Sequence, residues 1–385
     1  MNRILSIFSL LIIIGCSNGE TNNNFNAEIS GFKPKTLAIK KERTLEFEND
    51  TIVGLYGNIK VLKVDNNEVI YGTNFMMNRI EKFDFDEGYI GSILFEENEN
   101  LKRISWSESL FINKDSIFLF GDAERLALID DQGNFKQSWN FSRILKRNDN
   151  IEGIDPINND LSFFIRDNSI FFRTYPKYNW DTDWKYYTKP FMVQFDLVNS
   201  KILKSLGDFP AYMYDNRHFK FVNDHKMSWV LTNDGSLVYS LRRDPYLYKL
   251  NLRNGEMVKI PAQASAIKNF ELVPRIYDSQ RDTNYLITKG IYHRILYDRY
   301  RDLYYRVVTH EQPLKSANGR LNNAAKKVFT LVVLDAEFNY LGEAVFEDKD
   351  NYSYLNFDIC SEGLIFPIYD GLEDVVTFEI YNIVL

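Results

Sequence analysis

The chain has 385 residues, with 46 basic and 53 acidic side chains and a formal net charge of −7. This length allows two domains or one large all-β domain. Aromatic residues make up 15% of the chain, and because such side chains suit a half-buried pleated surface, the composition favours β structure. The acidic balance argues against nucleic acid as a partner, since phosphate backbones need a basic surface. With only two cysteines, Cys16 and Cys360, we expect no disulfide framework and no cysteine-based metal site.

Residues 1–15 predict an export signal. Arg3 precedes an apolar stretch that runs from Ile4 to Ile14, which is shorter than the roughly 20 residues that a membrane-spanning helix needs. Gly15 followed by Cys16 resembles the lipobox of bacterial lipoproteins. The resemblance implies cleavage before Cys16 and acylation of its thiol, and two or more acyl chains attach a protein durably to a membrane. The alternative is a fortuitous cysteine after an ordinary signal peptide.

Residues 16–35 are expected to form the lipidated cysteine and a flexible tether. The stretch SNGETNNNFNA (17–27) is polar and asparagine-rich, so it cannot bury enough surface to fold alone. In the sorting of some Gram-negative lipoproteins, Asp directly after the lipidated cysteine retains the protein in the inner membrane, and here that position is Ser17. We therefore expect an outer-membrane lipoprotein that faces the periplasm or the cell surface.

Residues 36–385 contain a repeated unit of short apolar strands that includes a strand ending in Asp or Asn, a tight turn and an outgoing strand. Five such turns lie 46, 66, 55 and 84 residues apart (130−84, 196−130, 251−196, 335−251), at Asp84, Asp130, Asp196, Asn251 and Asp335. Four-stranded propeller blades repeat about every 40–50 residues, so the wider spacings indicate insertions. Two separate β-sandwiches are the alternative, although no stretch between the units resembles an interdomain linker.

The two ends of this domain are each incomplete. Residues 354–385 supply about three strands, and residues 35–50 alternate apolar and polar side chains without forming a unit of their own. Pairing the two segments would remove two exposed sheet edges. The sequence therefore predicts an all-β six-bladed β-propeller, a single domain over 36–385, whose ring is closed by the N-terminal strand joining the last blade.

With its lipobox followed by such units, the chain resembles the six-bladed β-propeller lipoproteins of unknown function, with TolB-like or NHL-like propellers, found in bacteria that degrade complex carbohydrates. The segments that carry the resemblance are residues 236–252 and 292–308. The family has no assigned activity, so the resemblance implies fold and location only.

Residues 174–190, TYPKYNWDTDWKYYTKP, form the predicted insertion of the third blade. Aromatic faces beside hydrogen-bonding groups suit a sugar ring or a peptide. A loop that folds back over its own blade is the alternative, and the residues favour it. Asp181 and Asp183 alternate with Asn179 as calcium ligands would, but the glycine and glutamate of a calcium loop are missing. The candidate ligand-binding residues of this insertion are Tyr178, Trp180, Asp181, Asp183 and Trp184.

The fifth unit contains YDRYRDLYYRVVTHEQP (297–313), which predicts two strands joined near Asp302. An arginine between aromatic neighbours can hold a carboxylate in a bidentate fork, which makes Arg299, Tyr305 and Arg306 candidate ligand-binding residues. Contacts between blades are the favoured alternative. The following basic stretch, KSANGRLNNAAKK (315–327), is expected to be a mobile loop and is a candidate docking point for an anionic surface.

No motif in the chain specifies catalysis. HEQPL (310–314) lacks the second histidine of a zinc-protease helix, and the four histidines, at 218, 225, 293 and 310, are scattered over different units. We expect no catalytic residue, no metal site and no cofactor. Cys360, in a strand-like context, is interpreted as a buried small hydrophobe.

Together these features predict a lipid-anchored cell-envelope β-propeller, held to the membrane at Cys16, that acts as a binding module for a protein, peptide or glycan. One alternative is a carbohydrate-active hydrolase or lyase with its site at the mouth of the propeller channel, and another is a structural envelope protein. The sequence leaves the enzyme question uncertain and leans against an enzyme.

Overall fold

The structure is a computed structural model, and it describes residues 24–26, 29, 31–48, 56–64, 67–74, 77–95, 106–113, 116–121, 125–145, 151, 153–154, 163–215, 219–220, 226–274, 276, 278–348, 350–368 and 375–385. Cys16, His218 and His225 lie outside these residues, and so does the whole predicted signal peptide.

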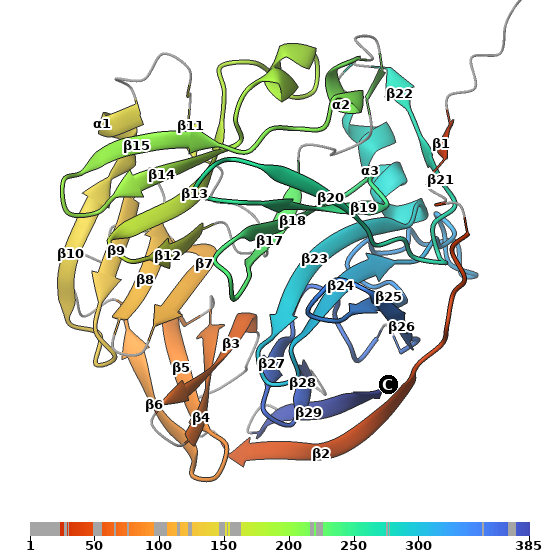
Figure 1. Cartoon of the computed structure of the whole chain (residues 1–385). Coiled ribbons are helices and arrows are strands. Elements are labelled where there is room, and N and C mark those ends of the chain that lie inside the picture. The colour runs from red at the N-terminus through yellow and green to blue at the C-terminus, as the bar shows by residue number, and fades with distance from the viewer. Residues whose placement is uncertain are drawn as a thin grey trace, which may run out of the picture.

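Six antiparallel sheets follow one another around a ring (Figure 1). The first three blades are β3 (Tyr56–Val64), β4 (Asn67–Asn74), β5 (Arg79–Asp84) and β6 (Gly88–Leu94); β7 (Trp106–Asn113), β8 (Ser116–Gly121), β9 (Arg125–Ile129) and β10 (Phe135–Asn140); and β12 (Phe163–Arg166), β13 (Ser169–Tyr175), β14 (Met192–Asp196) and β15 (Lys201–Leu206), with β11 (Gly153–Ile154) beside β13. The last three are β17 (Met227–Leu231), β18 (Leu237–Leu241), β19 (Tyr246–Leu250) and β20 (Met257–Pro261); β23 (Ile291–Asp298), β24 (Leu303–Thr309), β25 (Phe329–Leu334) and β26 (Tyr340–Phe346); and β27 (Asp358–Cys360), β28 (Gly363–Ile368), β29 (Val375–Val384) and β2 (Ala38–Glu48). The six-bladed propeller predicted from the repeat is therefore confirmed.

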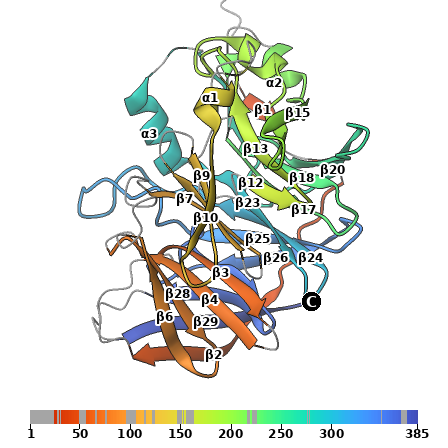
Figure 2. The same ribbon diagram turned by 90° about the vertical axis from the view of Figure 1, so that its left-hand side faces the viewer.

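Short elements join the blades. The helices are α1 (Phe141–Leu145), α2 (Tyr212–Asp215), α3 (Ser279–Thr288) and the 3-10 helix η2 (Trp184–Thr188), and two-stranded pairs are formed by β1 (Asn24–Asn26) with β21 (Asn269–Glu271) and by β16 (Phe219–Lys220) with β22 (Val273–Pro274). The helices α1, α2 and α3 lie together in the upper part of Figure 2. Among the described residues, none of the helices is long and apolar enough to cross a membrane.

The predicted closure of the ring is present. β2 pairs antiparallel with β29, so that Leu45 lies opposite Phe378 in the register. The Phe47 ring, 6% exposed, stacks on Phe83 of the first blade at 5.3 Å and contacts Phe378 of the last blade at 6.0 Å. One strand from the start of the domain therefore completes the last blade and packs against the first, which joins the two ends of the chain.

The five landmark residues lie at equivalent places, in the turn between the third and fourth strands of the first five blades. Each side chain accepts hydrogen bonds from backbone N–H groups two to four residues further on, as Asp130 Oδ1 does from Gln132 and Asn134. The others are Asp84, Asp196, Asn251 and Asp335. Three of these turns also contain a glycine, Gly88, Gly133 or Gly255, with φ between 78° and 86°, which suits a tight hairpin turn. The turn chemistry was thus identified correctly from the sequence.

The innermost strand of each blade has one backbone edge that faces the ring axis. Side chains from the neighbouring blade hydrogen-bond to this edge at several points. The Asp358 carboxylate accepts from the Val61 N–H at 2.8 Å, and Ser228 Oγ accepts from the Ile295 N–H at 3.1 Å. These bonds satisfy backbone N–H groups that have no partner strand, and they hold neighbouring blades together.

The chain before β2 runs along the outside of the fifth blade. Lys35 and Leu37 exchange backbone hydrogen bonds with Glu343 of β26, and Ile29 N–H donates to the Gln263 side chain. Further upstream, β1 lies beside β21 at the upper right of Figure 1. Residues 24–26 fall within the segment that the sequence assigns to a flexible tether, so the structure attaches part of that segment to the propeller.

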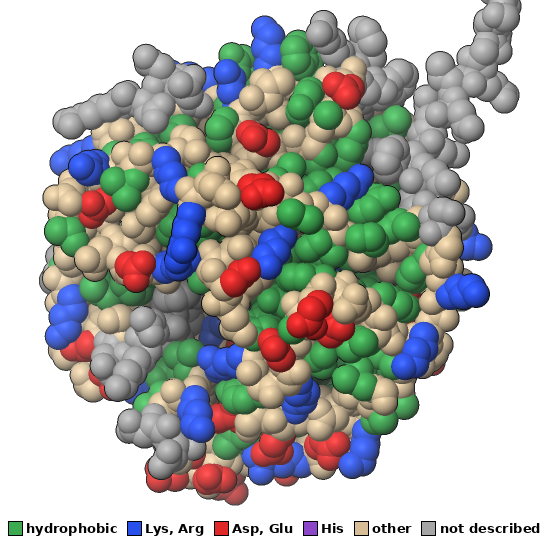
Figure 3. Space-filling model, in the orientation of Figure 1, with side chains coloured by type: hydrophobic (Ala, Val, Ile, Leu, Met, Phe, Trp, Pro, Cys, Tyr) green, Lys and Arg blue, Asp and Glu red, His purple; other side chains and the backbone are tan. Residues whose placement is uncertain are grey.

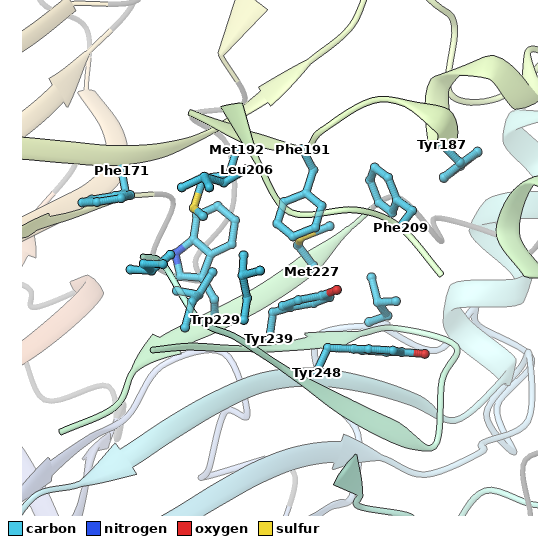
Figure 4. Close-up of a cluster of buried hydrophobic side chains, with 14 of the residues drawn as sticks. Phe171, Tyr187, Phe191, Met192, Leu206, Phe209, Met227, Trp229, Tyr239 and Tyr248 are labelled. Carbon is cyan, nitrogen blue, oxygen red and sulfur yellow. The ribbon is translucent and has the colours of Figure 1, made fainter. Parts of the chain in front are cut away.

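The core consists of apolar clusters between adjacent blades. The cluster between the third and fourth blades contains Phe191, Trp229 and Tyr239, all nearly fully buried (Figure 4). Gly207 lies against it with φ of 77°, and a Cβ there would meet the Phe191 ring at 2.4 Å, so only glycine fits. Cys360 is fully buried in the cluster between the last and first blades, and burial raises the pKa of its thiol to about 12, which confirms its interpretation as a core residue.

Candidate functional site

One end of the ring carries all the long connections. In a blade of four antiparallel strands, the second-to-third connection and the link to the next blade lie at the same end. The third-blade insertion joins β13 to β14, the fifth-blade insertion joins β24 to β25, and α1, α2 and α3 lie on links between blades. All five therefore belong to one end, which we call the insertion end. The opposite end has short hairpin turns, such as those at Asp130 and Asp335.

The third-blade insertion is held by its own polar side chains. Asn179 Oδ1 accepts from the N–H groups of Asp181 and Thr182 at 2.8 and 3.2 Å, and Asp183 caps η2 by accepting from the Lys185 N–H at 2.9 Å. The alternating oxygens of NWDTDW thus serve backbone turns. The described residues contain no group of three or more His, Cys, Asp or Glu side chains arranged to hold a metal ion.

The inner side of this insertion is part of the core. Tyr186 and Tyr187 are each 1% exposed and belong to the apolar cluster of Figure 4, where Tyr187 meets Phe209 edge-on at 5.1 Å. Tyr187 Oη also donates to the Trp180 carbonyl at 3.1 Å. The insertion therefore folds back over its blade, which is the alternative that the sequence favoured.

The outer side of the insertion retains accessible aromatic surface. Tyr178, Trp180 and Trp184 are half-buried, and the ammonium groups of Lys185 and Lys189 lie 5.9 and 5.8 Å from the centre of the Tyr178 ring. Of the five candidate residues in this insertion, these three rings and Asp183 keep part of their surface in solvent. The Asp181 side chain is only 2% exposed. The prediction that Asp181 contacts a ligand is therefore corrected, because this residue is buried.

Arg306 is a second correction. Its side chain is fully buried, and the guanidinium donates to Ser240 Oγ at 2.9 Å and to the carbonyls of Ala262 and Asp244 at 2.8 and 2.6 Å. The group also lies 3.6 Å from the centre of the Tyr292 ring. These partners satisfy the guanidinium within the protein, so Arg306 joins the fourth blade to the fifth and is not placed to meet a ligand.

Tyr305 is likewise buried, at 2% exposed. Its hydroxyl donates to the Asp298 carboxylate at 3.0 Å, and burial, together with that carboxylate, raises the pKa of the phenol. Asp298 also accepts from Arg301 and caps the turn between β23 and β24. Tyr305 therefore supports a turn and is corrected from a ligand contact to a structural residue.

Arg299 is exposed, but it lies at the turn between β23 and β24. It donates to the Val61 carbonyl and to the Tyr300 hydroxyl, each at 3.2 Å. Because first-to-second-strand turns lie at the hairpin end, the structure does not bring Arg299 together with the third-blade aromatic residues. Figure 3 shows one face of the molecule, where acidic and basic side chains are interspersed around a hydrophobic band.

The structure also reveals a pocket of about 560 Å³ at the insertion end that the sequence did not indicate. Two stretches of the chain form it, namely the β20–β23 link, including the residue after α3, and the start of the fifth-blade insertion. Its lining residues are Ala266, Lys268, Asn269, Glu271, Lys289, His310 and Glu311. The HEQPL stretch singled out His310 only as part of an incomplete zinc-protease motif, and nothing in the sequence linked it to Lys289, 21 positions upstream, or to Ala266, 44 positions upstream.

The described residues include two histidines, one of which lines this pocket. His310 lines it, and its Nε2 is 2.6 Å from Thr330 Oγ1. Burial and the nearby Lys327 charge lower the pKa of this imidazole. His293, 4% exposed, is on the inner strand β23 with Nε2 3.2 Å from Thr309 Oγ1, and burial, followed by the Arg242 charge, lowers its pKa well below the usual value. Both rings are therefore neutral at pH 7.

The fifth-blade insertion, which the sequence predicts to be a mobile loop, contains a hairpin. Residues 314–322 form a hairpin, in which Asn322 N–H donates to the Leu314 carbonyl and Ser316 N–H to the Arg320 carbonyl, both at 2.9 Å. Lys327 ends the insertion in a buried position, where its ammonium donates to the Leu286 and Lys289 carbonyls at the end of α3. These hydrogen bonds give the small and polar residues of the insertion a regular turn.

These features define the class of the protein: a six-bladed β-propeller closed by its N-terminal strand, with two ordered insertions at one end of the ring. The family model described as a domain of unknown function (DUF4221) matches residues 36–345. The chain belongs to this family. No curated protein sequence matches the chain.

Solved structures agree on the fold. A DUF4221 family member from Bacteroides vulgatus superposes with a TM-score of 0.73 at 18% identity, covering 91% of this chain and 99% of that one. A protein from Bacteroides fragilis superposes with a TM-score of 0.50 at 10% identity, covering 91% and 95%. A virginiamycin B lyase from Staphylococcus aureus gives 0.42 at 10% identity, covering 89% and 99%, which is too distant to bear on activity.

Proposed function

We propose that this protein is a lipid-anchored propeller of the cell envelope that binds a protein, peptide or glycan at its insertion end. The anchor is Cys16, and the location is the outer membrane, facing the periplasm or the cell surface. Loops at one end of a rigid ring can carry binding residues without affecting the core.

The observation that carries the proposal is the half-exposed aromatic surface of the third-blade insertion. Tyr178 and Trp180 pack against the buried cluster that contains Tyr186 and Tyr187, and Trp184 begins the short helix η2 that carries these two tyrosines. The backbone beside these rings is also held, because Asn179 Oδ1 accepts from the Asp181 N–H and Asp183 Oδ1 accepts from the Lys185 N–H. Aromatic rings fixed in this way offer contact area at a low cost in conformational entropy, which suits a sugar ring or a peptide side chain.

Binding to glycan and peptide arrays tests this proposal directly. We expect Trp180→Ala and Trp184→Ala each to weaken binding about tenfold or more, as anchors at the centre of an interface do. Tyr89→Ala is the matched control, because this half-buried aromatic follows the β5–β6 turn at the hairpin end. Binding that survives both tryptophan substitutions, with unchanged unfolding temperatures, would contradict the proposed site.

The anchor has its own test. Metabolic labelling with palmitate should mark the wild-type chain and leave the Cys16→Ser variant unlabelled, and the labelled protein should fractionate with the outer membrane. The second cysteine is buried, so it does not confuse the result. Equal labelling of the two chains would refute acylation at Cys16.

One observation favours the hydrolase or lyase alternative. His310, neutral at pH 7, shares its pocket with the carboxylates of Glu271 and Glu311, and a neutral imidazole beside a carboxylate can transfer protons. If the pocket is catalytic, turnover of a polysaccharide by the purified protein should be lost in His310→Gln. An activity that persists in that variant would exclude this residue as the acid or base.

A further inference from the structure

The fifth-blade hairpin presents positive charge and an apolar side chain to solvent. Lys315 and Arg320 are exposed near its tip, and Leu321 is 58% exposed. No acidic residue occurs between Gln312 and Leu334, in a protein whose net charge is −7. In Figure 2 the blue hairpin projects to the left, below α3.

The hairpin keeps its shape without using these side chains. Ser316 Oγ donates to Asn318 Oδ1 at 2.6 Å and to the Arg320 carbonyl at 3.0 Å, and Asn322 Nδ2 donates to the Pro313 carbonyl at 2.7 Å. The backbone and these short polar groups therefore fix the turn. The side chains of Lys315, Arg320 and Leu321 take no part in these hydrogen bonds and present charge and apolar surface to solvent.

The base of the hairpin lies beside the place where the N-terminal segment joins the propeller. β1 pairs with β21, so that Asn24 is opposite Glu271. Glu271 lines the same pocket as His310 and Glu311, which begin the hairpin connection. Cys16 precedes Asn24 by eight residues, so a lipid on Cys16 would lie within about 29 Å of β1, even with the chain fully extended.

We propose that the tip of this hairpin, Lys315, Arg320 and Leu321, is a second membrane contact that docks on an anionic phospholipid surface and orients the propeller on the bilayer. The inference rests on the lipid-anchored location proposed above. A membrane is favoured over a protein partner because β1, which begins eight residues after Cys16, pairs with β21, and β21 contributes Glu271 to the pocket at the base of the hairpin. Basic side chains are drawn to anionic headgroups, while an exposed leucine can enter the interfacial layer.

The remaining charges on this side do not oppose such contact. Lys268 and Lys289 line the pocket beside Glu271 and Glu311, so the positive and negative charges there balance. Lys326, at the end of the hairpin connection, pairs with Asp350 at 3.6 Å. The unbalanced positive charge is therefore carried by Lys315 and Arg320 at the tip.

The test uses residues 16–385 made in the cytoplasm, where no lipid is added. This chain contains every residue that the structure describes. We expect it to sediment with vesicles of phosphatidylcholine mixed with phosphatidylglycerol, to remain in solution with phosphatidylcholine alone, and to dissociate as salt is raised. Lys315→Gln combined with Arg320→Gln should weaken partitioning about 30-fold, since each cation lost near an anionic surface costs about fivefold.

The matched control is Lys201→Gln combined with Arg253→Gln. These two cations are exposed and lie at hairpin-end turns of the third and fourth blades, so the control changes net charge equally and should bind as the wild type does. Leu321→Ser should weaken binding without changing its salt dependence. Because the assay needs no lipid on Cys16, its result is independent of the palmitate test.

Any of three results with vesicles would overturn the inference: no binding to anionic vesicles, equal binding by the hairpin variant and the control, or equal binding to neutral vesicles. Hairpin-dependent binding to polyglutamate without binding to vesicles would also overturn it, and would point to an acidic protein as the partner.

Discussion

Replacing Arg306 with methionine removes the charge that joins the fifth blade to the fourth while keeping a side chain of similar length. The guanidinium is fully buried and donates to Ser240 Oγ, to the Ala262 carbonyl and to the Asp244 carbonyl at 2.6–2.9 Å. Burial lowers its pKa to about 10, so the group is charged at neutral pH. Methionine would leave these buried acceptors without a donor.

The expected loss follows from these contacts. Each buried acceptor left unpaired costs roughly 1–3 kcal/mol, and the contact with the Tyr292 ring, at 3.6 Å, adds up to about 2 kcal/mol. The desolvation cost of the charge is relieved at the same time, so we expect a net loss of about 3–5 kcal/mol from the three acceptors left without a donor. At about 2 °C per kcal/mol for a large domain, the unfolding midpoint should fall by about 6–10 °C.

Thermal unfolding followed by circular dichroism measures this shift, and urea unfolding provides a second value. Arg299→Met is the control, since Arg299 is exposed, and it should leave the midpoint nearly unchanged. If Arg306→Met unfolded within about 2 °C of the wild type, the interpretation of Arg306 as the joint between two blades would be refuted.

Three further predictions concern the glycine in the core, the buried histidines and the ring closure. Gly207→Ala should cost about 2–5 kcal/mol in unfolding free energy, because alanine adds both the strain of φ 77° and a clash with the Phe191 ring; a midpoint within error of the wild type would contradict the packing. Burial lowers the pKa of His293 and His310 from 6.5, so the unfolded chain binds more protons and stability should fall as the pH drops from 7 to 5. The loss of unfolding free energy is at most about 2 kcal/mol for His293 and less for the partly screened His310. Urea unfolding at several pH values should show a flatter dependence of stability on pH when His293→Gln and His310→Gln are combined. Phe47→Ala should cost about 3–5 kcal/mol, because its ring packs between the first and last blades, and unchanged urea unfolding would show that this closure contact contributes little.

Much of the fold could be predicted from local patterns in the sequence. The residues after the Asp and Asn landmarks form the same turn in five blades, because a short carboxylate or amide can bond the backbone N–H groups just ahead of it. The incomplete strands at the two ends predicted their own pairing, now seen as β2 with β29. The turns depend on residues that are neighbours in the sequence, and the strand pairing depends on the cost of an exposed sheet edge. Both features can therefore be predicted from a single sequence.

The candidate site depended on contacts that strand periodicity does not contain. Tyr304 and Arg306 lie on one face of β24 and Tyr305 on the other, as strand alternation requires and as their different clusters and partners show. Whether a face meets a ligand or another blade depends on how the sheets pack, and the fourth blade covers Arg306. In the third-blade insertion, the chain likewise buries Tyr186 and Tyr187 and leaves Trp180 and Trp184 half-exposed.

The sequence by itself determined the six repeated units, their turns, the closing strand and the places where insertions occur, because each depends on local chemistry or on edge pairing. Only the tertiary structure decided which insertion residues face solvent, because blades distant in sequence cover the others. It also assembled the pocket around His310 from segments about 20–40 residues apart, and it placed β1 beside the base of the basic hairpin. Those arrangements arise from packing between blades, and no single stretch of the chain encodes them.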